Sequence, residues 1–246
     1  MLNEDPVVFM LDVDNTLLDN DRFAADLTER LDDDFGKPER ERYWSIYAEW
    51  RDRLGYADYL GALQAFRAGD DDEPALLRMS EFLLDYPFSE RLYPRALAAL
   101  DHLRTIGTTA IVSDGDIVFQ PRKIQRSGLW DAVDGRVLVT VHKERRLGLV
   151  QRRFPASHYV MVDDKPQLLA AMKRVLTDRL TTVFVRQGHY ATESDGLAID
   201  PAPDLTIGRI GDLCDLALAD FHAATATRVV DTDRQKSPET ASLEHP

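Results

Sequence analysis

The chain is poor in cysteine and has no long apolar segment. Its 246 residues include one cysteine, Cys214, which excludes an intrachain disulfide. The apolar runs are far too short to cross a bilayer, and the first residues lack the basic start and apolar stretch of a signal peptide. We therefore expect a cytoplasmic protein that does not bind membranes.

Positive charge is also scarce. The sequence has 30 Lys and Arg against 43 Asp and Glu, a net charge of −13. This balance argues against a general binder of nucleic acid, so we expect no nucleic-acid partner. It does not exclude anionic substrates, because a bound metal and a few lysines can invert the local field.

Short apolar runs of β type alternate with helical patterns over most of the chain. The runs lie at residues 7–11, 108–112, 137–141, 159–162 and 181–185, with an edge strand at 204–207. The helical patterns lie at residues 94–106, 118–127, 144–153, 166–176 and 210–223. This alternation predicts the α/β class, with a doubly wound parallel sheet and right-handed crossovers.

One long stretch interrupts the alternation. From about residue 21 to residue 89 the pattern is helical and contains no convincing strand. We interpret residues 19–89 as a helical domain inserted into a core made of residues 1–18 and 90–223. Residues 224–246 are polar and lack apolar periodicity, which predicts a disordered tail.

The first apolar run ends in two acids one residue apart, Asp12 and Asp14. Two carboxylates at the end of a buried strand repel each other and lose hydration. A bound divalent cation is the simplest way to make that arrangement favourable. A carboxylate at this end of a parallel strand also points into the crevice where open α/β sheets bind ligands.

Polar residues follow four of the predicted strands, each at the end of its strand. In parallel strands such positions gather along one edge of the sheet, which would then hold four carboxylates, one hydroxyl and one ammonium. That set suits the transfer of a phosphoryl group. The residues are Asp12, Asp14, Ser113, Lys143, Asp163 and Asp164.

Several of these residues also have an ordinary structural interpretation. Ser113 and Asp114 could form a simple turn, in which Asp114 either shapes the turn or orients the site. Lys143 stands among charged residues and could start a solvated helix. Asp163 and Asp164 could cap the helix that follows them, with or without binding a metal.

With these residues in this order, the chain resembles the haloacid dehalogenase-like (HAD) hydrolase superfamily, in its phosphatase branch with a helical cap. The resemblance covers roughly residues 6–18 and 90–190, and the pattern Asp-x-Asp-x-Thr-Leu is met in full from Asp12 to Leu17. The hydroxyl, lysine and paired-acid motifs are each weak alone. Their order along the chain makes the resemblance strong, and it implies a Rossmann-like core.

The resemblance implies a role for each catalytic residue. Asp12 would be the nucleophile that forms an aspartyl-phosphate, and Asp14 would protonate the leaving oxygen and later activate water. Ser113 would donate a hydrogen bond to a phosphoryl oxygen. Lys143 would offset charge on Asp12 and on the transferring group.

The same resemblance implies Mg²⁺ as the cofactor. The ion would take a carboxylate oxygen of Asp12, the backbone carbonyl of Asp14, and carboxylates of Asp164 and Asp163. Asp163 stands where the family has glycine, so Asp164 is the stronger metal candidate. The adjacent Lys165 is expected to have a surface role rather than a phosphate contact.

Two positions depart from the family pattern. Glu144 follows the lysine where proline is common, which weakens the placement of that lysine. The fourth motif often carries another acid a few residues later, where this chain has Gln167 and Leu168. Metal binding would then depend more heavily on the two adjacent aspartates.

The inserted helices are rich in aromatic residues. A stripe at three- and four-residue spacing predicts the core of the insertion, and it consists of Tyr43, Ile46, Tyr47, Trp50 and Leu54. Residues off the stripe are the candidates to face a substrate, and they are Trp44, Arg51 and Tyr56. We assign no catalytic role to His142 or His189.

The sequence therefore favours a Mg²⁺-dependent phosphatase that acts on a small phosphorylated metabolite, as a monomer or homodimer. A phosphomutase or phosphotransferase would use the same nucleophile. A catalytically silent binding or regulatory protein is a third possibility, although such proteins usually lose a motif residue. Dehalogenase chemistry is disfavoured, because it does not need the second aspartate, Asp14.

Overall fold

A six-stranded parallel sheet forms the centre of the protein. The computed structural model describes residues 7–69, 73–194 and 196–224, and the predicted tail therefore lies almost wholly outside the described residues. The strand order is β3-β2-β1-β4-β5-β6, and all neighbouring strands run parallel, which confirms the α/β doubly wound class. The strands are β1 (Val7–Leu11), β2 (Thr108–Asp114), β3 (Val137–Thr140), β4 (His158–Asp163), β5 (Leu180–Val185) and β6 (Leu205–Ile207).

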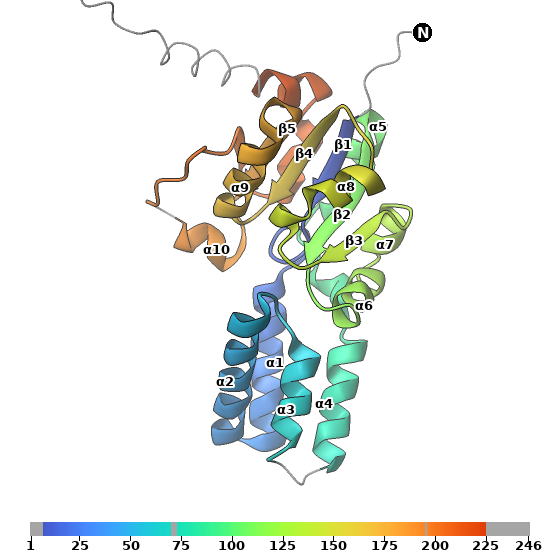
Figure 1. Cartoon of the computed structure of the whole chain (residues 1–246). Coiled ribbons are helices and arrows are strands. Elements are labelled where there is room, and N and C mark those ends of the chain that lie inside the picture. The colour runs from blue at the N-terminus through green and yellow to red at the C-terminus, as the bar shows by residue number, and fades with distance from the viewer. Residues whose placement is uncertain (1–6, 70–72, 195, 225–246) are drawn as a thin grey trace, which may run out of the picture.

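Alternate residues of β1 enter two different hydrophobic cores, because side chains of a strand alternate between the two faces of the sheet. Phe9 and Leu11 pack with α5 and α6, whereas Val8 and Met10 pack with α8 and α9. The sheet is therefore covered on both faces, as Figure 1 shows. The covering helices are α5 (Ala96–Ile106), α6 (Phe119–Arg126), α7 (Leu129–Ala132), α8 (Leu147–Arg153) and α9 (Pro166–Leu176).

Four helices lie between β1 and the next core helix, beyond the carboxyl ends of the strands (Figure 1). We call residues 20–85 the helical segment; no strand occurs among its described residues. Gly36 and Gly55, both with φ of 80°, end the first two helices. The helices are α1 (Asn20–Phe35), α2 (Lys37–Leu54), α3 (Tyr59–Arg67) and α4 (Glu73–Asp85), followed by the 3₁₀ turn η1 (Phe88–Arg91).

Two predicted helices are wrong in extent. The pattern over 144–153 is split, since Arg146 leaves helical geometry between the 3₁₀ turn η2 (Lys143–Arg145) and α8. The helix predicted over 210–223 is also broken, because Leu216 is extended and its carbonyl oxygen lies 2.7 Å from His102 Nε2. The chain forms the 3₁₀ turn η4 (Ile210–Asp215) and then a separate helix at 218–224.

Short elements fill the gaps between the predicted ones. The sequence patterns missed α7 and α10 (Gly188–Glu193), which are too short to show helical periodicity.

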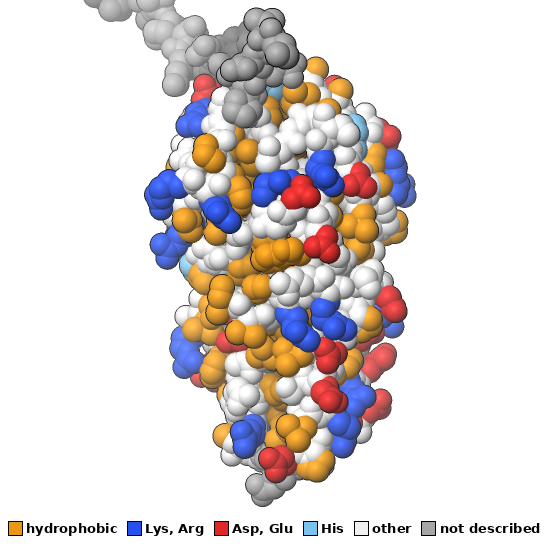
Figure 2. All heavy atoms as spheres, turned by 90° about the vertical axis from the view of Figure 1, so that its right-hand side faces the viewer, with side chains coloured by type: hydrophobic (Ala, Val, Ile, Leu, Met, Phe, Trp, Pro, Cys, Tyr) orange, Lys and Arg blue, Asp and Glu red, His pale blue; other side chains and the backbone are white. Residues whose placement is uncertain are grey.

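None of the helices in the described part of the chain is long and apolar enough to span a membrane. Figure 2 shows the face beside β3, where hydrophobic side chains alternate with basic and acidic ones.

A buried ion pair joins α9 to the edge of the sheet. Lys173 Nζ lies 2.9 Å from Asp204 Oδ2 and donates to the carbonyl oxygen of Leu180 at 2.5 Å. The same Asp204 oxygen accepts from the backbone nitrogen and the hydroxyl of Thr182. The pair fixes the loop that leads into β6.

We expect Lys173→Met to lower the free energy of unfolding by about 3 kcal/mol, because it removes the ammonium that pairs with a buried carboxylate. Urea unfolding followed by circular dichroism measures this change. Arg153→Met, at an exposed position of α8, is the matched control and should change stability by less than about 0.5 kcal/mol. Equal stability of the two variants would contradict the structural role of the pair.

Candidate active site

The predicted polar residues meet at one edge of the sheet, because β2, β1 and β4 are neighbours in it. Asp12 follows β1, Ser113 lies in β2, and Asp163 ends β4. Each of the three side chains is almost completely buried. Lys143, from the turn η2 after β3, is equally buried and reaches the same point.

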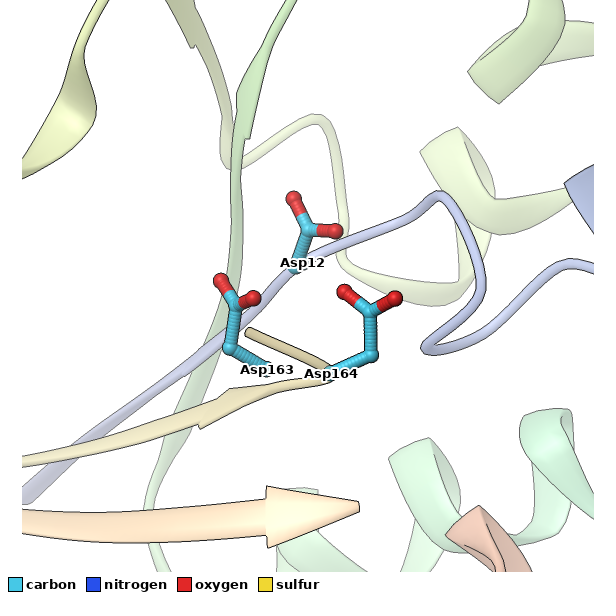
Figure 3. Close-up of side chains that lie close together, drawn as sticks. All are labelled: Asp12, Asp163 and Asp164. Carbon is cyan, nitrogen blue, oxygen red and sulfur yellow. The ribbon is translucent and has the colours of Figure 1, made fainter. Parts of the chain in front are cut away.

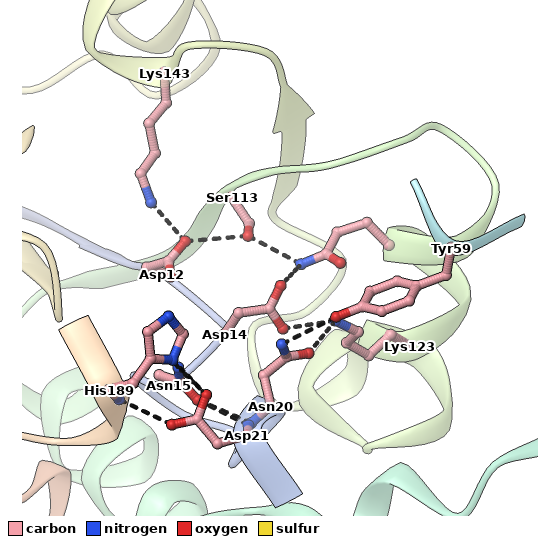
Figure 4. A network of polar contacts seen from close by, with 11 residues as sticks. Asp12, Asp14, Asn15, Asn20, Asp21, Tyr59, Ser113, Lys123, Lys143 and His189 are labelled. Atoms are coloured by element: carbon pink, nitrogen blue, oxygen red, sulfur yellow. Dashed lines mark hydrogen bonds and ion pairs between the residues drawn. The ribbon is translucent and has the colours of Figure 1, made fainter. Parts of the chain in front are cut away.

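Asp12 is held in its ionised form. Its Oδ1 accepts from Lys143 Nζ at 2.5 Å and from Ser113 Oγ at 3.1 Å (Figure 4). Burial raises the pKa of Asp12, but the ammonium groups of Lys143 and Lys165 and these hydrogen bonds outweigh it, so the pKa lies below its usual value. A buried, ionised carboxylate at a strand end is a suitable nucleophile.

Lys143 has a buried, charged side chain and does not start a solvated helix. Its Nζ lies 2.7 Å from Asp163 Oδ2, in addition to its contact with Asp12. Burial lowers the pKa of Lys143, but Asp12, Asp163 and Asp114 raise it more, so the ammonium stays charged. The backbone nitrogen of Lys143 donates to Asp114 Oδ1 at 2.9 Å, so Asp114 orients the turn that carries the lysine.

Three buried carboxylates form a group that could hold a metal ion. Oxygens of Asp12, Asp163 and Asp164 all lie within 4.8 Å of one another (Figure 3). Within the described residues, neither carboxylate oxygen of Asp164 accepts a hydrogen bond. Burial, followed by the charges of Asp163 and Asp12, raises the pKa of Asp164 to about 9.

These features fit a divalent cation bound by oxygen ligands. A cation beside Asp164 would offset both the loss of hydration and the repulsion that raise its pKa. Asp163 is already engaged, because Oδ2 pairs with Lys143 and Oδ1 accepts from the backbone nitrogen of Lys165 at 2.9 Å. Asp12 and Asp164 are therefore the carboxylates best placed as ligands.

The surface role expected for Lys165 is wrong. Burial lowers the pKa of Lys165, but Asp12, Asp163 and Asp164 raise it above its usual value, so its ammonium belongs to the acidic site. Its Nζ also lies 4.6 Å from the centre of the Tyr190 ring. The lysine adds a second cation to the site.

Asp14 points away from the three acids and toward α6. Its Oδ1 accepts from Lys123 Nζ at 2.6 Å, and its Oδ2 accepts from Gln120 Nε2 at 3.2 Å. The side chain is outside the acidic group, so a metal contact could come only from its backbone carbonyl, which stays a prediction. Sequence reasoning missed Lys123 and Gln120, since a lysine on an amphipathic helix is usually solvent-exposed.

A cavity of about 160 Å³ lies between Asp14 and the helical segment, and its lining does not include the three carboxylates of the acidic group. Arg51 and Tyr56, two of the expected substrate-facing residues, line it together with Asp14 and Lys165. Tyr47, assigned to the core of the insertion, also lines it. A larger hollow of about 610 Å³ lies beside β3 and α8, away from the acidic group.

Trp44, the third expected substrate-facing residue, does not line this cavity. Its ring packs edge-on against Tyr43 and Tyr47, with centroids 5.4 Å and 5.2 Å away. It therefore belongs to the aromatic packing of α2. The stripe expectation was correct for Tyr43, which is fully buried.

His189 joins α10 to the loop after Asp12. Its Nδ1 lies 2.6 Å from Asp21 Oδ1, which also accepts from Asn15 Nδ2 at 2.9 Å. The preceding Gly188 has φ of 68°, and a Cβ there would lie 2.4 Å from Asn15 Cβ. Only glycine allows this approach, so we assign the cluster a structural role at the wall of the cavity.

The fold and the acidic site define an α/β protein with a doubly wound parallel sheet and a buried aspartate directly after its central strand. A family model described as haloacid dehalogenase-like hydrolase matches residues 7–175. The chain belongs to the haloacid dehalogenase-like hydrolase family. The comparison with curated proteins found no match.

Solved structures agree with this assignment. A haloacid dehalogenase-like hydrolase from Burkholderia xenovorans is 55% identical, with a TM-score of 0.80 over 87% of this chain and 100% of that chain. A haloacid dehalogenase-like hydrolase from Xanthomonas campestris is 14% identical (TM-score 0.62, 93% and 97% covered). An L-2-haloacid dehalogenase is 18% identical (TM-score 0.58, 85% and 98% covered). The last two show likeness of fold alone.

We expect Mg²⁺ to stabilise the protein, because the ion would bind the folded acidic group and not the unfolded chain. At a concentration 100 times its dissociation constant, the gain would be about 2.7 kcal/mol. Thermal unfolding with and without Mg²⁺ measures it. Asp164→Asn should abolish the shift, whereas Asp33→Asn, at an exposed position of α1, should retain it. An unchanged shift in Asp164→Asn would contradict this metal site.

Proposed function

We propose that this protein is a Mg²⁺-dependent phosphatase that hydrolyses a small phosphorylated metabolite through an aspartyl-phosphate. The observation that carries the proposal is the environment of Asp12. Two ammonium groups and a hydroxyl hold this buried carboxylate ionised, and a second aspartate, Asp14, stands two residues later. That combination supplies both a nucleophile and a proton carrier.

In the first half-reaction, a carboxylate oxygen of Asp12 attacks phosphorus. The bond between phosphorus and the leaving oxygen breaks, and that oxygen takes its electron pair and a proton from Asp14. The hydroxyl of Ser113, which donates to Asp12 in this structure, would turn to donate to a phosphoryl oxygen, and Lys143 and Lys165 would balance the negative charge.

In the second half-reaction, Asp14 accepts a proton from water as the water oxygen attacks phosphorus. The bond between phosphorus and Asp12 breaks, which restores the carboxylate and releases inorganic phosphate. Asp14 then holds the proton needed for the next cycle. Together, the two half-reactions convert the phosphate ester and water into an alcohol and inorganic phosphate.

The group of Asp12, Asp163 and Asp164 would hold the metal, with the backbone carbonyl of Asp14 as a further ligand. When bound there, Mg²⁺ would supply positive charge to phosphoryl oxygens that three carboxylates would otherwise repel. The carboxylate oxygens of Asp164, which accept no hydrogen bond from any residue that the structure describes, support this assignment.

The helical segment would act as a cap over this site. Its residues Arg51, Tyr47 and Tyr56 line the cavity, so substrate contacts would come from it as well as from the core. A volume of about 160 Å³ favours a small metabolite over a polymer. A cap would also exclude bulk water during phosphoryl transfer.

Dehalogenation is the second candidate, because a dehalogenase shares the fold. That reaction also uses a nucleophilic aspartate, but it needs no proton carrier two residues later. Asp14, held by two side chains beside the cavity, therefore favours phosphoryl transfer. A phosphomutase would share the first half-reaction and differ in returning the phosphoryl group to the bound product.

We expect wild-type protein to release phosphate from a generic aryl phosphate in the presence of Mg²⁺. Asp12→Asn should lower the rate by at least about 1,000-fold, because it removes the covalent route. Asp33→Asn is the control and should keep the wild-type rate. A parallel assay should detect no halide from 2-chloropropionate.

Retention of phosphate release in Asp12→Asn would contradict the assignment of Asp12 as the nucleophile. Halide release without phosphate release would favour the dehalogenase instead. Phosphoryl transfer to a second bound hydroxyl, with no inorganic phosphate, would favour the phosphomutase. A panel of small phosphate esters then ranks substrates by kcat/KM.

A further inference from the structure

Lys123 is an unusual buried charge outside the motifs of the family. It lies on α6 with 1% of its surface exposed. Its ammonium is surrounded by four aromatic rings, with centroids 5.4–5.9 Å away, and they belong to Phe23, Tyr59, Phe88 and Phe119. Cation–π attraction offsets part of the lost hydration but does not replace hydrogen-bond partners.

The partners of this ammonium are two oxygens at the edge of the cavity. Lys123 Nζ donates to Asp14 Oδ1 at 2.6 Å and to Asn20 Oδ1 at 3.0 Å (Figure 4). Asn20 begins α1, and its amide donates to the hydroxyl of Tyr59 on α3 at 3.3 Å. The lysine therefore connects Asp14 to two helices of the helical segment.

The other oxygen of Asp14 is held from the side of the nucleophile. Gln120 Nε2 donates to Asp14 Oδ2 at 3.2 Å and to Ser113 Oγ at 3.1 Å. Ser113 in turn donates to Asp12. Both oxygens of Asp14 are thus fixed by side chains of α6, one residue facing the nucleophile and the other facing the helical segment.

We propose that Lys123 is the positioning residue of Asp14, and that it fixes the carboxyl group where the leaving oxygen of the substrate departs. The proposal rests on the proposed function. Lys123 acts through Asp14, which lines the cavity, whereas Lys123 itself is sealed by the aromatic rings. Without the ammonium, only the hydrogen bond from Gln120 would hold Asp14, and proton donation would lose part of its alignment.

The reaction step that depends on this alignment is cleavage of the ester bond. As Asp12 bonds to phosphorus, the electron pair of the breaking bond stays on the leaving oxygen, which takes a proton from Asp14. A leaving group that departs from a weakly acidic alcohol needs this proton much more than one that departs from a more acidic alcohol. The dependence of rate on the leaving group therefore separates positioning of Asp14 from a general structural role.

The test compares two esters of nearly equal size, ethyl phosphate and 2,2,2-trifluoroethyl phosphate. Trifluoroethanol is the more acidic alcohol, so its phosphate needs less proton donation. For Lys123→Met we expect kcat/KM to fall by about 100-fold for ethyl phosphate and by less than about 10-fold for the fluorinated ester. Asp14→Asn should give the same pattern, and the double variant should add little to it.

Arg122→Met is the matched control. Arg122 is the preceding residue on α6 and also joins the core to the helical segment, through the carbonyl oxygen of Leu84 and the carboxylate of Asp85. No hydrogen bond joins Arg122 to Asp14 within the described residues. Arg122→Met should keep the wild-type ratio of the two kcat/KM values within about 2-fold. Lys123→Arg retains a charged donor, so its kcat/KM for ethyl phosphate should be at least about 10-fold higher than that of Lys123→Met.

Equal losses on the two esters in Lys123→Met would overturn the proposal, because that result indicates a structural role. Unchanged activity on ethyl phosphate would overturn it as well. If Lys123→Met does not fold, Asn20→Ala carries the same test, with a smaller change in the same direction expected and an unchanged ratio contradicting it. Wild-type protein that releases no phosphate from either ester, or from any ester in the panel, would instead contradict the proposed function.

Discussion

The structure depends on how negative charge is balanced at the carboxyl ends of β1 and β4. Asp12, Asp163 and Asp164 are buried together there, with oxygens within 4.8 Å of one another. Lys143 lies between two of them and contacts both. Removing three carboxylates from water is costly unless cations compensate, so the ends of the central strands and the turn η2 depend on one another.

Part of this arrangement could be predicted from the sequence. Apolar runs that end in polar residues predicted the strands and the edge where they meet, and Asp12, Ser113, Lys143 and Asp163 do meet there. Strand ends are predictable because chain direction fixes which edge of a parallel sheet they reach. The division into core, helical domain and tail stays a prediction, since residues 225–246 are outside the described part of the chain.

Other features could not be predicted from local patterns. Lys123 lies in α6 and Lys165 directly precedes α9, and lysine side chains at such positions are usually in water. Lys123 is buried because α6 packs against Phe23 and Tyr59 of the helical segment. The helix expected at 210–223 failed because a contact with His102, more than a hundred positions earlier in the chain, helps hold Leu216 extended. In each case a residue distant in sequence decides the outcome, and periodicity contains no information about it.

The most direct measurement is detection of the covalent intermediate. Wild-type protein mixed with a reactive phosphate ester and Mg²⁺, then quenched in acid within one turnover and digested, should yield a phosphorylated peptide with the added group on Asp12. The same peptide from Asp12→Asn should carry no phosphate. Turnover to inorganic phosphate with no phosphoryl group on Asp12 at any quench time, or a phosphoryl group on another residue, would contradict nucleophilic catalysis by this aspartate.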